Sequence, residues 1–461
     1  MSRKSKTLII VLALLLVLGG GYAGTLLWKN KAADTERETF SPPMELGNLE
    51  SSELIRIEVP GITIEKNNGI WELTYLEQGI PPGGIELDQT QIQFMTFSLA
   101  QVWTEGVVDE APPDISAFGL DNPSSRTIIT DNAGRTVEYL LGDMTPSRTS
   151  YYLMEKGNPG VYSVSVYTAV YMQNFLSIIR NKYLFPTFEL TELLLLRIDS
   201  GSTPIELRLK ETSLQSEPVF HYSTHVLNSP YKSPRGVYNE TLNNMVKALN
   251  VLAVVDFIDD NPSSLEPYGL DKPVRIFFQT TEKTVELLIG NAVDGKRYAK
   301  QAGAPGVFTL GGIDSIINTR AIDLSDRFAL LVNIDWVDRL TISGGEQHLA
   351  ADLRGSGDEA VFSLNGKKTV TSSFRTFYQT VIGLLIDTEI PAGQRPDPNA
   401  AGTITIEYQL NTPPDSRASI TLIPYNRDFY ALWQDGAAEF LIARSQVRKI
   451  YEAASAMEYG D

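Results

Sequence analysis

Apolar residues recur in the same order three times along the chain, and this pattern predicts three units that each combine one helix with several strands. In each unit, four apolar positions are spaced by three, four and three residues, which marks one face of a helix. These positions are Ile92, Met95, Leu99 and Val102, then Leu242, Met245, Leu249 and Leu252, and finally Phe374, Phe377, Val381 and Leu384. Short alternating segments precede and follow each helix, so we expect the helix to pack against strands.

The strands of the first unit are marked by alternating segments with turn signals between them. Ile62–Glu65 and Ile70–Tyr75 alternate and flank Asn67–Gly69, which is a hairpin signal. Another pair of alternating segments, Thr127–Thr130 and Thr136–Leu141, comes after the helix. Because several strands follow one helix without strict alternation of strand and helix, the sequence predicts an α+β fold with mostly antiparallel sheets.

A six-residue motif aligns the first two units. Phe118–Pro123 reads Phe-Gly-Leu-Asp-Asn-Pro, and Tyr268–Pro273 reads Tyr-Gly-Leu-Asp-Lys-Pro, 150 residues later. Its glycine permits a positive φ, its aspartate is expected to cap the turn, and its proline precedes the next strand. The residues of this structural turn are Gly119, Asp121, Pro123, Gly269, Asp271 and Pro273. The functional interpretation makes the two aspartates matched ligands or paired acids, but a turn needs nothing beyond the structural one.

Two further features extend the alignment to a third, more degenerate unit. Each unit begins with a strand that carries one arginine, expected to pair with an acid, at Arg56, Arg197 and Arg339. Each unit ends in two strands with aromatic residues ten positions apart, expected in the core; the pairs are Tyr152 and Tyr162, Tyr298 and Phe308, and Tyr430 and Phe440. The third unit lacks the Gly-Leu-Asp-x-Pro motif. The predicted units are residues 46–185, 190–330 and 336–461.

The N-terminal segment has the pattern of a membrane anchor. Three basic residues precede Thr7–Leu27, which contains no charged residue. About 20 apolar residues span a bilayer as a helix, so this stretch is long enough. The basic flank is expected on the cytoplasmic side, which places the body outside the cell membrane as a single-pass protein. We interpret residues 1–30 as basic flank and anchor, and residues 31–45 as a tether.

A cleaved signal peptide is the alternative interpretation of the same segment. Gly21–Ala23 would then be its small-residue cleavage site. The uncleaved anchor is favoured because the apolar run continues through Leu26, Leu27 and Trp28.

Charge and cysteine content narrow the classes of function. The formal net charge of −17 at pH 7 disfavours nucleic acid and anionic lipid as ligands, because both need clustered cations. The chain contains no cysteine, so neither a disulfide nor a lipid-modified cysteine is available, and stability has to come from ordinary cores.

These recurring motifs resemble those of the "domain of unknown function 4340" family. The resemblance rests on the Gly-Leu-Asp-x-Pro turn, the strand Thr136–Gly142 and its counterpart Thr284–Gly290, the hairpin at Pro159–Tyr162 and its counterpart Pro305–Phe308, and the N-terminal anchor. It covers nearly all of the chain beyond residue 45, most clearly in the first two units. It implies a bacterial envelope protein held at the membrane, of a kind often encoded beside ABC transporter components of the gliding-motility type. The family has no established catalytic residues, so none is carried over.

The sequence offers little material for catalysis or metal binding. Two of its three histidines, His221 and His225, have the spacing of a metal-binding helix face, but no helical pattern or metalloprotease motif accompanies them. Neither a nucleophile elbow nor a phosphate-binding loop of the known patterns occurs. Asp256, Asp259 and Asp260 lie close together but lack the glycine and distal glutamate of a calcium loop. We assign no catalytic, cofactor-binding or metal-ligating residue.

Two hypotheses of function follow from these observations. The favoured one is a non-enzymatic, membrane-anchored module outside the cytoplasm that binds or scaffolds envelope or membrane proteins. The resemblance implies an ABC-type, gliding-motility-like transport complex as its partner. The alternative is an envelope hydrolase that uses two carboxylates on cell-wall glycans, which requires an acid pair about 5–10 Å apart.

Overall fold

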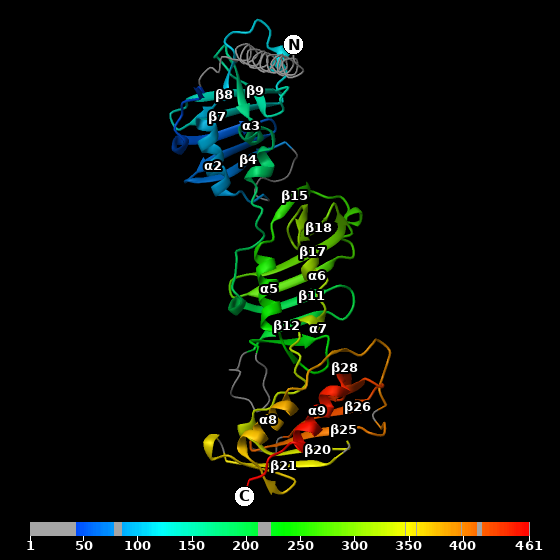
Figure 1. The fold of residues 1–461 in the computed structure, drawn as a ribbon. Helices are drawn as coiled ribbons and strands as arrows, with labels where there is room; N and C mark the ends of the chain where they lie inside the picture. Colours follow the sequence, from blue (N-terminus) through cyan, green and yellow to red (C-terminus); the bar gives the residue numbers. More distant parts are fainter. Residues whose placement is uncertain are drawn as a thin grey trace, which may run out of the picture. The chain divides into compact units, whose positions relative to one another are not determined.

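The computed structural model divides into two compact units, one ending at Asn181 and the other beginning at Lys182 (Figure 1). The residues that it describes are 43–77, 85–210, 223–345, 347–355, 357–397, 399–412 and 417–460. The predicted anchor Thr7–Leu27 and most of the predicted tether lie outside these residues. Within the described ranges, none of the helices has the length and hydrophobicity that crossing a bilayer requires.

The first unit contains an antiparallel sheet of eight strands in the order β4-β3-β2-β7-β8-β9-β10-β6. Its strands are β2 (Leu54–Val59), β3 (Ile62–Asn67), β4 (Ile70–Leu76), β6 (Gly106–Asp109), β7 (Ser125–Asp131), β8 (Thr136–Met144), β9 (Ser150–Glu155) and β10 (Val161–Ser165). A two-stranded sheet pairs β1 (Glu45–Leu46) with β5 (Val102–Trp103). The helices are α2 (Gln89–Ala100), α3 (Val166–Gln173) and α4 (Phe175–Ile179), with 3-10 turns η1 (Ser51–Glu53) and η3 (Ser116–Phe118). We call this set of elements the first module.

The second unit contains two such sets, which we call the second and third modules. The second module has nine strands: β11 (Leu193–Asp199), β12 (Ile205–Leu209), β13 (His225–Ser229), β14 (Arg235–Gly236), β15 (Val254–Asp259), β16 (Val274–Thr280), β17 (Thr284–Val293), β18 (Lys296–Gln301) and β19 (Val307–Gly311). Its helices are α5 (Asn239–Asn250), α6 (Asp314–Ile317) and α7 (Ala321–Leu324), with η4 (Leu190–Glu192) and η5 (Glu266–Tyr268).

The third module also has nine strands, and its two helices are both long. The strands are β20 (Val337–Ser343), β21 (Leu349–Arg354), β22 (Val361–Leu364), β23 (Lys367–Lys368), β24 (Thr388–Glu389), β25 (Ile404–Leu410), β26 (Arg417–Pro424), β27 (Phe429–Gln434) and β28 (Ala437–Ala443). The helices are α8 (Thr371–Ile382) and α9 (Arg444–Ser455), with η6 (Ile334–Trp336) and η7 (Gly357–Glu359).

The three large sheets resemble one another in strand order. In each, a strand that comes after the first long helix lies at the far edge of the sheet and pairs with the last strand, as β6 does with β10, β15 with β19, and β24 with β28. All pairings in the sheets are antiparallel, so the predicted α+β fold with mostly antiparallel sheets is confirmed.

The helices predicted from the apolar spacing are α2, α5 and α8, and each buries the predicted face. Asp88 caps α2, because its carboxylate accepts hydrogen bonds from the backbone N–H groups of Thr90 and Gln91. The fourth predicted position of each helix lies beyond its last turn, so the helices are shorter than the pattern indicates. These three residues, Val102, Leu252 and Leu384, are nevertheless buried, because the chain stays on the same core after the helix ends.

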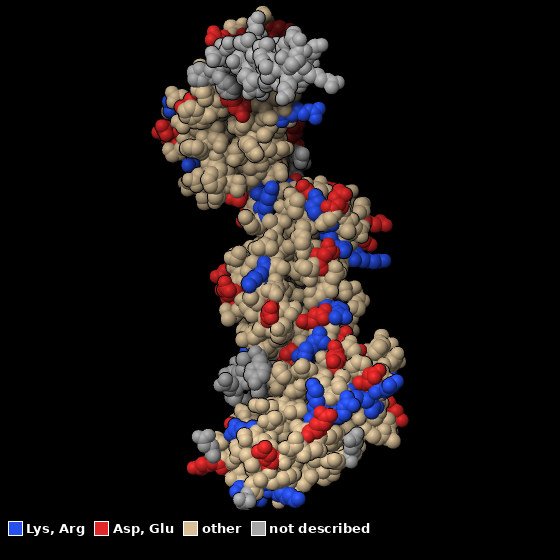
Figure 2. Space-filling view, viewed as in Figure 1, with Lys and Arg blue, Asp and Glu red and all other residues tan. Residues whose placement is uncertain are grey.

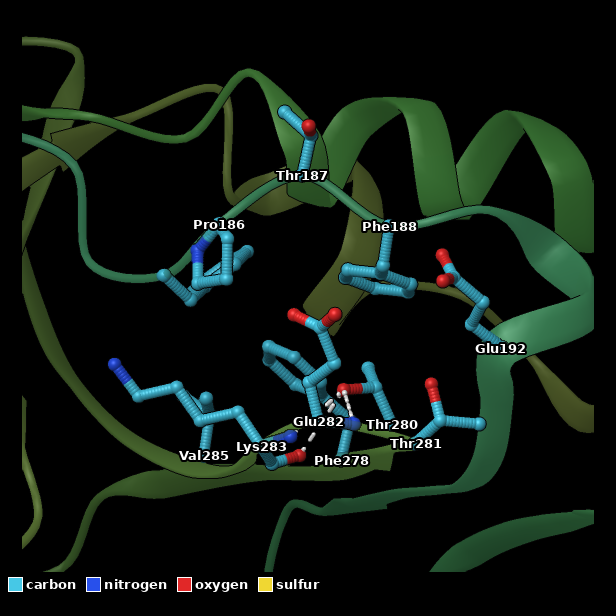
Figure 3. A pocket seen from close by; sticks show the side chains of 11 residues that line it. Pro186, Thr187, Phe188, Glu192, Phe278, Thr280, Thr281, Glu282, Lys283 and Val285 are labelled. Carbon is cyan, nitrogen blue, oxygen red and sulfur yellow. Dashed lines mark hydrogen bonds between the residues drawn. The ribbon is translucent and has the colours of Figure 1, made fainter.

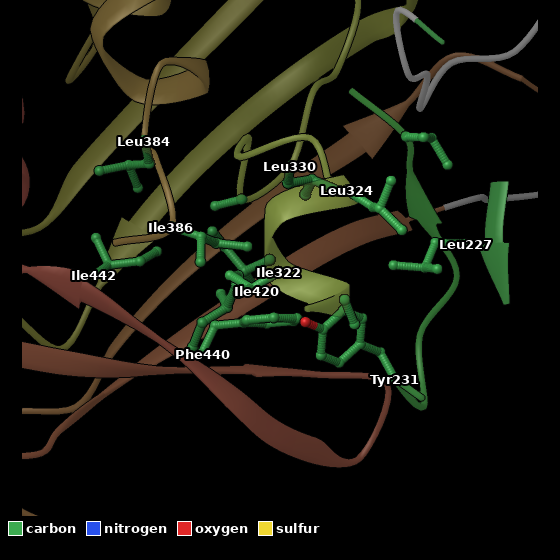
Figure 4. Packing of buried hydrophobic residues seen from close by; sticks show 14 of the residues in the cluster. Leu227, Tyr231, Ile322, Leu324, Leu330, Leu384, Ile386, Ile420, Phe440 and Ile442 are labelled. Atoms are coloured by element: carbon green, nitrogen blue, oxygen red, sulfur yellow. The ribbon is translucent and has the colours of Figure 1, made fainter. Parts of the chain in front are cut away.

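The modules differ in how they complete their hydrophobic cores. The first module has a core of its own, in which Ile92 and Met95 of α2 pack against the sheet. The second and third modules share one continuous core. Figure 4 shows the place where they meet, with Tyr231 after β13 facing Phe440 of β28. The two rings meet edge to face with their centroids 4.6 Å apart, and the Tyr231 hydroxyl donates a hydrogen bond of 2.6 Å to Glu389.

A buried arginine strengthens this junction. The side chain of Arg235 in β14 is only 2% exposed, and its guanidinium donates hydrogen bonds to the backbone carbonyls of Phe328 and Ala329. It also lies over the ring of Phe440, 5.3 Å from the ring centre, and 3.9 Å from a carboxylate oxygen of Asp326. Burial lowers the pKa of Arg235, against the attraction of Asp326. An arginine so far from water is held by these partners, so the junction depends on it.

Candidate functional site

The recurring Gly-Leu-Asp-x-Pro motif forms the same turn in both modules that carry it. Gly119 and Gly269 each follow a 3-10 turn with φ of 68°, a conformation that favours glycine. A side chain there would also strike Asp143 in the first module and Asn291 in the second. Leu120 and Leu270 point into the protein and are buried. Pro123 and Pro273 lie just before β7 and β16, as the sequence predicts.

The two aspartates of the motif do not cap the turn. Asp121 and Asp271 are exposed, and their carboxylates make no hydrogen bond within the described part of the chain. The side chain that caps the turn stands earlier, where Asp114 accepts from the backbone N–H of Ser116 and Ser264 accepts from that of Glu266. The predicted caps are therefore replaced by the residue two positions before the 3-10 turn, because its side chain reaches the first free N–H.

The three recurring arginines form cross-strand ion pairs. Arg56 lies opposite Glu65 in the β2–β3 ladder, Arg197 opposite Glu206 in β11–β12, and Arg339 opposite Asp352 in β20–β21. Their nitrogen-to-oxygen distances are 2.8, 3.6 and 3.3 Å. The expected pairing with acids is confirmed, and these exposed pairs stabilise sheet register rather than form a site.

The recurring aromatic residues also have structural partners. Tyr162, Phe308 and Phe440 are buried in the cores. Tyr152 and Tyr298 pack edge to face on the aromatic residue that opens the Gly-Leu-Asp-x-Pro motif, with ring centres 5.0 and 5.1 Å apart.

His225 is a core residue. Its ring nitrogens contact the Leu193 carbonyl oxygen and the Thr224 hydroxyl at 2.8 and 2.9 Å, and burial lowers its pKa. His221 lies outside the described residues. Asp256 forms an ion pair with the ammonium group of Lys296 and accepts a hydrogen bond from the Thr309 hydroxyl. Among the described residues, no group of three or more His, Cys, Asp or Glu side chains is placed to hold a metal ion.

A small cavity of about 50 Å³ lies in the second module, between the segment before η4 and the β16–β17 turn (Figure 3). Phe185, Phe188 and Phe278 pack together on one side, with ring centres 4.8 to 6.3 Å apart. At the turn, the Thr280 hydroxyl accepts from the backbone N–H groups of Glu282 and Lys283. Ligand pockets usually enclose about 300–1,000 Å³, so this space suits water rather than an organic ligand.

Two larger cavities occupy related places in the first and third modules. The first borders the end of β2, the start of β7 and the helices α3 and α4. The second borders the end of β20, the start of β25 and the helix α9. The first, about 300 Å³, is lined mainly by neutral residues such as Ser124, Ser125 and Gln173, with Glu77 as its charged residue. The second, about 800 Å³, is lined by three arginines among its sixteen residues: Arg427, Arg444 and Arg448.

The outer face of α2 is a third candidate, and it is apolar. Phe94 and Phe97 are 59% and 65% exposed and lie on the same face, because residues three apart on a helix are neighbours. The helix contains no charged residue, and Figure 2 shows an uncharged surface over α2 where charged side chains lie over α5. The same helix positions are Asn244 and Lys247 in α5.

The third module also has polar residues where α2 has its two phenylalanines. Thr376 and Gln379 stand at the corresponding positions of α8, and both are exposed. An aromatic pair on this face is therefore not required by the fold.

Together, these features define modules with mostly antiparallel sheets, in which the recurring glycines, arginines and aromatic residues have structural roles. The chain belongs to the family described as "Domain of unknown function (DUF4340)", whose model matches residues 80–273 and again residues 226–386. The double match agrees with a repeated domain. The chain matches no curated protein and no solved structure.

The sequence patterns did not lead us to predict either the apolar face of α2 or the arginine-lined cavity of the third module. The signal for the α2 face was present, because Phe94 and Phe97 fall outside the predicted apolar stripe of that helix. The signal for the basic cavity was weaker. Arg427 stands in a turn, 17 residues before Arg444 and 21 before Arg448, and only the fold brings them to one cavity.

Proposed function

We propose that this protein is a non-enzymatic, membrane-anchored module outside the cytoplasm, which holds a membrane-protein partner through the outer face of α2. The single observation that carries this proposal is the exposed pair Phe94 and Phe97 on a helix without charge. Leaving two phenylalanine rings in water forgoes the free energy that burial provides, and contiguous exposed apolar surface is typical of interaction sites. Three modules with similar sheets and divergent surfaces also suit a binding role.

The chemistry of α2 determines the kind of partner. A surface of phenylalanine, glutamine and threonine offers apolar contact and neutral hydrogen bonds, so the partner surface is apolar and uncharged. Association should therefore depend little on salt. The α2 surface thus differs from the rest of the chain, which is acidic and gives the protein its net charge of −17.

The position of α2 in the chain favours a partner in the same membrane. β1 pairs with β5, and β5 begins two residues after α2 ends, so the chain enters the first module beside this helix. The predicted tether of residues 31–45 reaches at most about 50 Å when fully extended. If residues 7–27 span the membrane, α2 lies within reach of the external parts of neighbouring membrane proteins, at high effective concentration. By family resemblance, the membrane subunit of an ABC-type transporter is the first candidate.

The test is a site-specific crosslink in native membranes with the full chain. Photo-crosslinking p-benzoylphenylalanine in place of Phe97 should trap one integral membrane protein, and the crosslink should persist at high salt. The variant Phe94→Asn with Phe97→Lys, which gives α2 the residues of α5, should weaken co-purification of that protein. Aromatic hot spots contribute roughly 2 kcal/mol each, so the loss should be at least about 30-fold.

The matched control is Tyr167→Ser, which removes an aromatic side chain that is 80% exposed on α3 of the same module. It should leave co-purification unchanged. A crosslink only to a second copy of this chain, or co-purification that survives the double variant, would contradict the proposal. Hydrolysis of peptidoglycan by the purified protein, abolished by one carboxylate substitution, would establish the enzyme alternative instead.

A further inference from the structure

The cavity of the third module is walled by elements that are distant in sequence. Gly344 and Gly345 follow β20, Gly402 precedes β25, Pro424 ends β26, and α9 closes the remaining side. Gly345 has no side chain, and one would collide with the hydroxyl of Tyr451 on α9. The result is a cavity of about 800 Å³, within the range of small-molecule sites.

Three arginines give this cavity its charge. Arg444 and Arg448 stand one turn apart on α9, and Arg427 comes from the turn between β26 and β27. Asp428 is the acidic residue among those lining it. Figure 2 shows several lysine and arginine side chains near α9 on the third module, with acidic side chains among them, on a protein with a net charge of −17.

Arg444 is held in a fixed orientation by its neighbours. Its Nε donates a hydrogen bond of 2.9 Å to the Asn426 carbonyl oxygen, and its guanidinium lies 4.3 Å from the centre of the Tyr430 ring. Its Nη1 also approaches the Tyr430 hydroxyl at 3.4 Å. A guanidinium oriented in this way loses less conformational freedom when it binds an anion.

Arg427 and Arg448 are exposed, and they have few other partners among the residues that the structure describes. Arg448 is 3.9 Å from Glu452 in a pair where both side chains are more than 60% exposed, which contributes little to stability. Neither arginine is explained by packing. The fold does not require arginines at these helix positions either, because α3 of the first module has Val166 and Val170 where α9 has Arg444 and Arg448.

We infer that this cavity binds a phosphate-bearing anion. Guanidinium groups pair with phosphate through two parallel hydrogen bonds, and three of them around one cavity suit a multiply charged group better than a single carboxylate. The phosphate belongs either to a soluble compound or to a lipid headgroup, since both present the same chemistry. This site is independent of the α2 surface and of whether the protein binds a partner there.

The test is calorimetric titration of the purified full chain with inorganic pyrophosphate. We expect saturable binding that weakens as salt is added. Arg427→Ala and Arg448→Ala should each weaken binding about tenfold, because a hydrogen bond to a charged group contributes at least about 1.4 kcal/mol. The double variant should abolish it. Competition by dihexanoyl phosphatidic acid, a phosphomonoester kept below its micelle concentration, assigns the site to a lipid headgroup, and its failure assigns the site to a soluble phosphate compound.

The matched control is Lys449→Ala, an exposed cation beside Arg448 that does not line the cavity. It should leave the affinity within about twofold, since exposed charges act weakly through solvent. Circular dichroism should show each variant folded, because Arg427 and Arg448 are exposed. Absence of pyrophosphate binding at millimolar concentration overturns the proposal. So does binding that the double variant retains, that Lys449→Ala weakens as much as Arg448→Ala, or that citrate matches in affinity.

Discussion

The first module and the pair formed by the second and third modules use similar sheets in opposite ways. The first completes a core of its own and leaves an aromatic helix face in water, with Phe94 and Phe97 exposed. The second and third modules merge their cores across Tyr231, Arg235 and Phe440, and their helices α5 and α8 are polar outside. Modules with the same strand order can therefore bury apolar side chains against a neighbouring module or leave them exposed for another molecule to bind.

The largest expected effect comes from removing the arginine at the junction. Arg235→Ala removes the buried guanidinium that lies 3.9 Å from the Asp326 carboxylate and donates to two backbone carbonyls. Breaking a buried ion pair in this way costs roughly 3–5 kcal/mol, so the second unit should lose this much stability while the first loses none. Hydrogen exchange followed by mass spectrometry distinguishes the two units.

Arg208→Ala is the matched control, because Arg208 is 57% exposed in its pair with Glu206 on β12 of the same unit. Its removal should cost at most about 1 kcal/mol. Equal effects of Arg235→Ala on both units would show that the division at Asn181 has no thermodynamic meaning.

The second effect in size concerns the glycine turn that the first two modules share. Gly119→Val and Gly269→Val each force a β-branched residue to a φ of 68° and against a neighbouring side chain, at a cost of roughly 1–3 kcal/mol. Each should destabilise only its own unit in chemical denaturation followed by hydrogen exchange.

Asp271→Asn serves as the comparison variant for this turn. It should cost less than Gly269→Val, because the carboxylate is exposed and makes no hydrogen bond in the described residues. Loss of function by Asp271→Asn with unchanged stability would assign a chemical role to that acid.

Lowering the pH is expected to have a smaller effect on stability, and only in the β7–β8 hairpin. At the β7–β8 turn, Asp131 accepts hydrogen bonds from the backbone N–H groups of Ala133 and Arg135, whereas Thr280 has this role at the β16–β17 turn. Burial alone would raise the pKa of Asp131, but hydrogen bonds from the Arg135 backbone and side chain outweigh it and lower the pKa.

The sign of the pH effect follows from that lowered pKa. The ionised form is favoured in the folded state, so the stabilisation is complete above the pKa of the unfolded chain, about 3.9. It is lost as the pH falls through the lower folded value. Hydrogen exchange, corrected for the intrinsic rate, should show the β7–β8 hairpin opening more readily at acid pH while β16–β17 does not change for this reason. Asp131→Asn should remove the difference, and its persistence in that variant would contradict the assignment.

The smallest effect on stability should come from the residues proposed to carry function. Phe94→Asn with Phe97→Lys changes exposed side chains, so the free energy of unfolding should change by no more than about 0.5 kcal/mol. Chemical denaturation measures it. A large destabilisation would show that the two rings pack on their own module, and would remove the basis for a partner surface.

Much of the fold follows from local patterns. The apolar stripes predicted α2, α5 and α8, and the strand arginines predicted cross-strand pairs such as Arg56 with Glu65. These succeed because side-chain periodicity and strand pairing act over a few residues. The turn caps were misplaced, because Asp114 and Asp121 both lie near the turn and only the backbone path decides which carboxylate reaches a free N–H.

The sequence by itself determined the antiparallel α+β class, the recurring glycine turn and the membership of a repeated family, because each depends on short-range spacing. Only the tertiary structure decided that Arg235 is buried at a junction, that Phe94 and Phe97 stay in water, and that Arg427 shares a cavity with Arg444. An overall charge of −17 gave no indication of that basic cavity. The physical reason is that burial and local electrostatic potential are set by residues far apart in the chain, which meet only when the sheets and helices have packed.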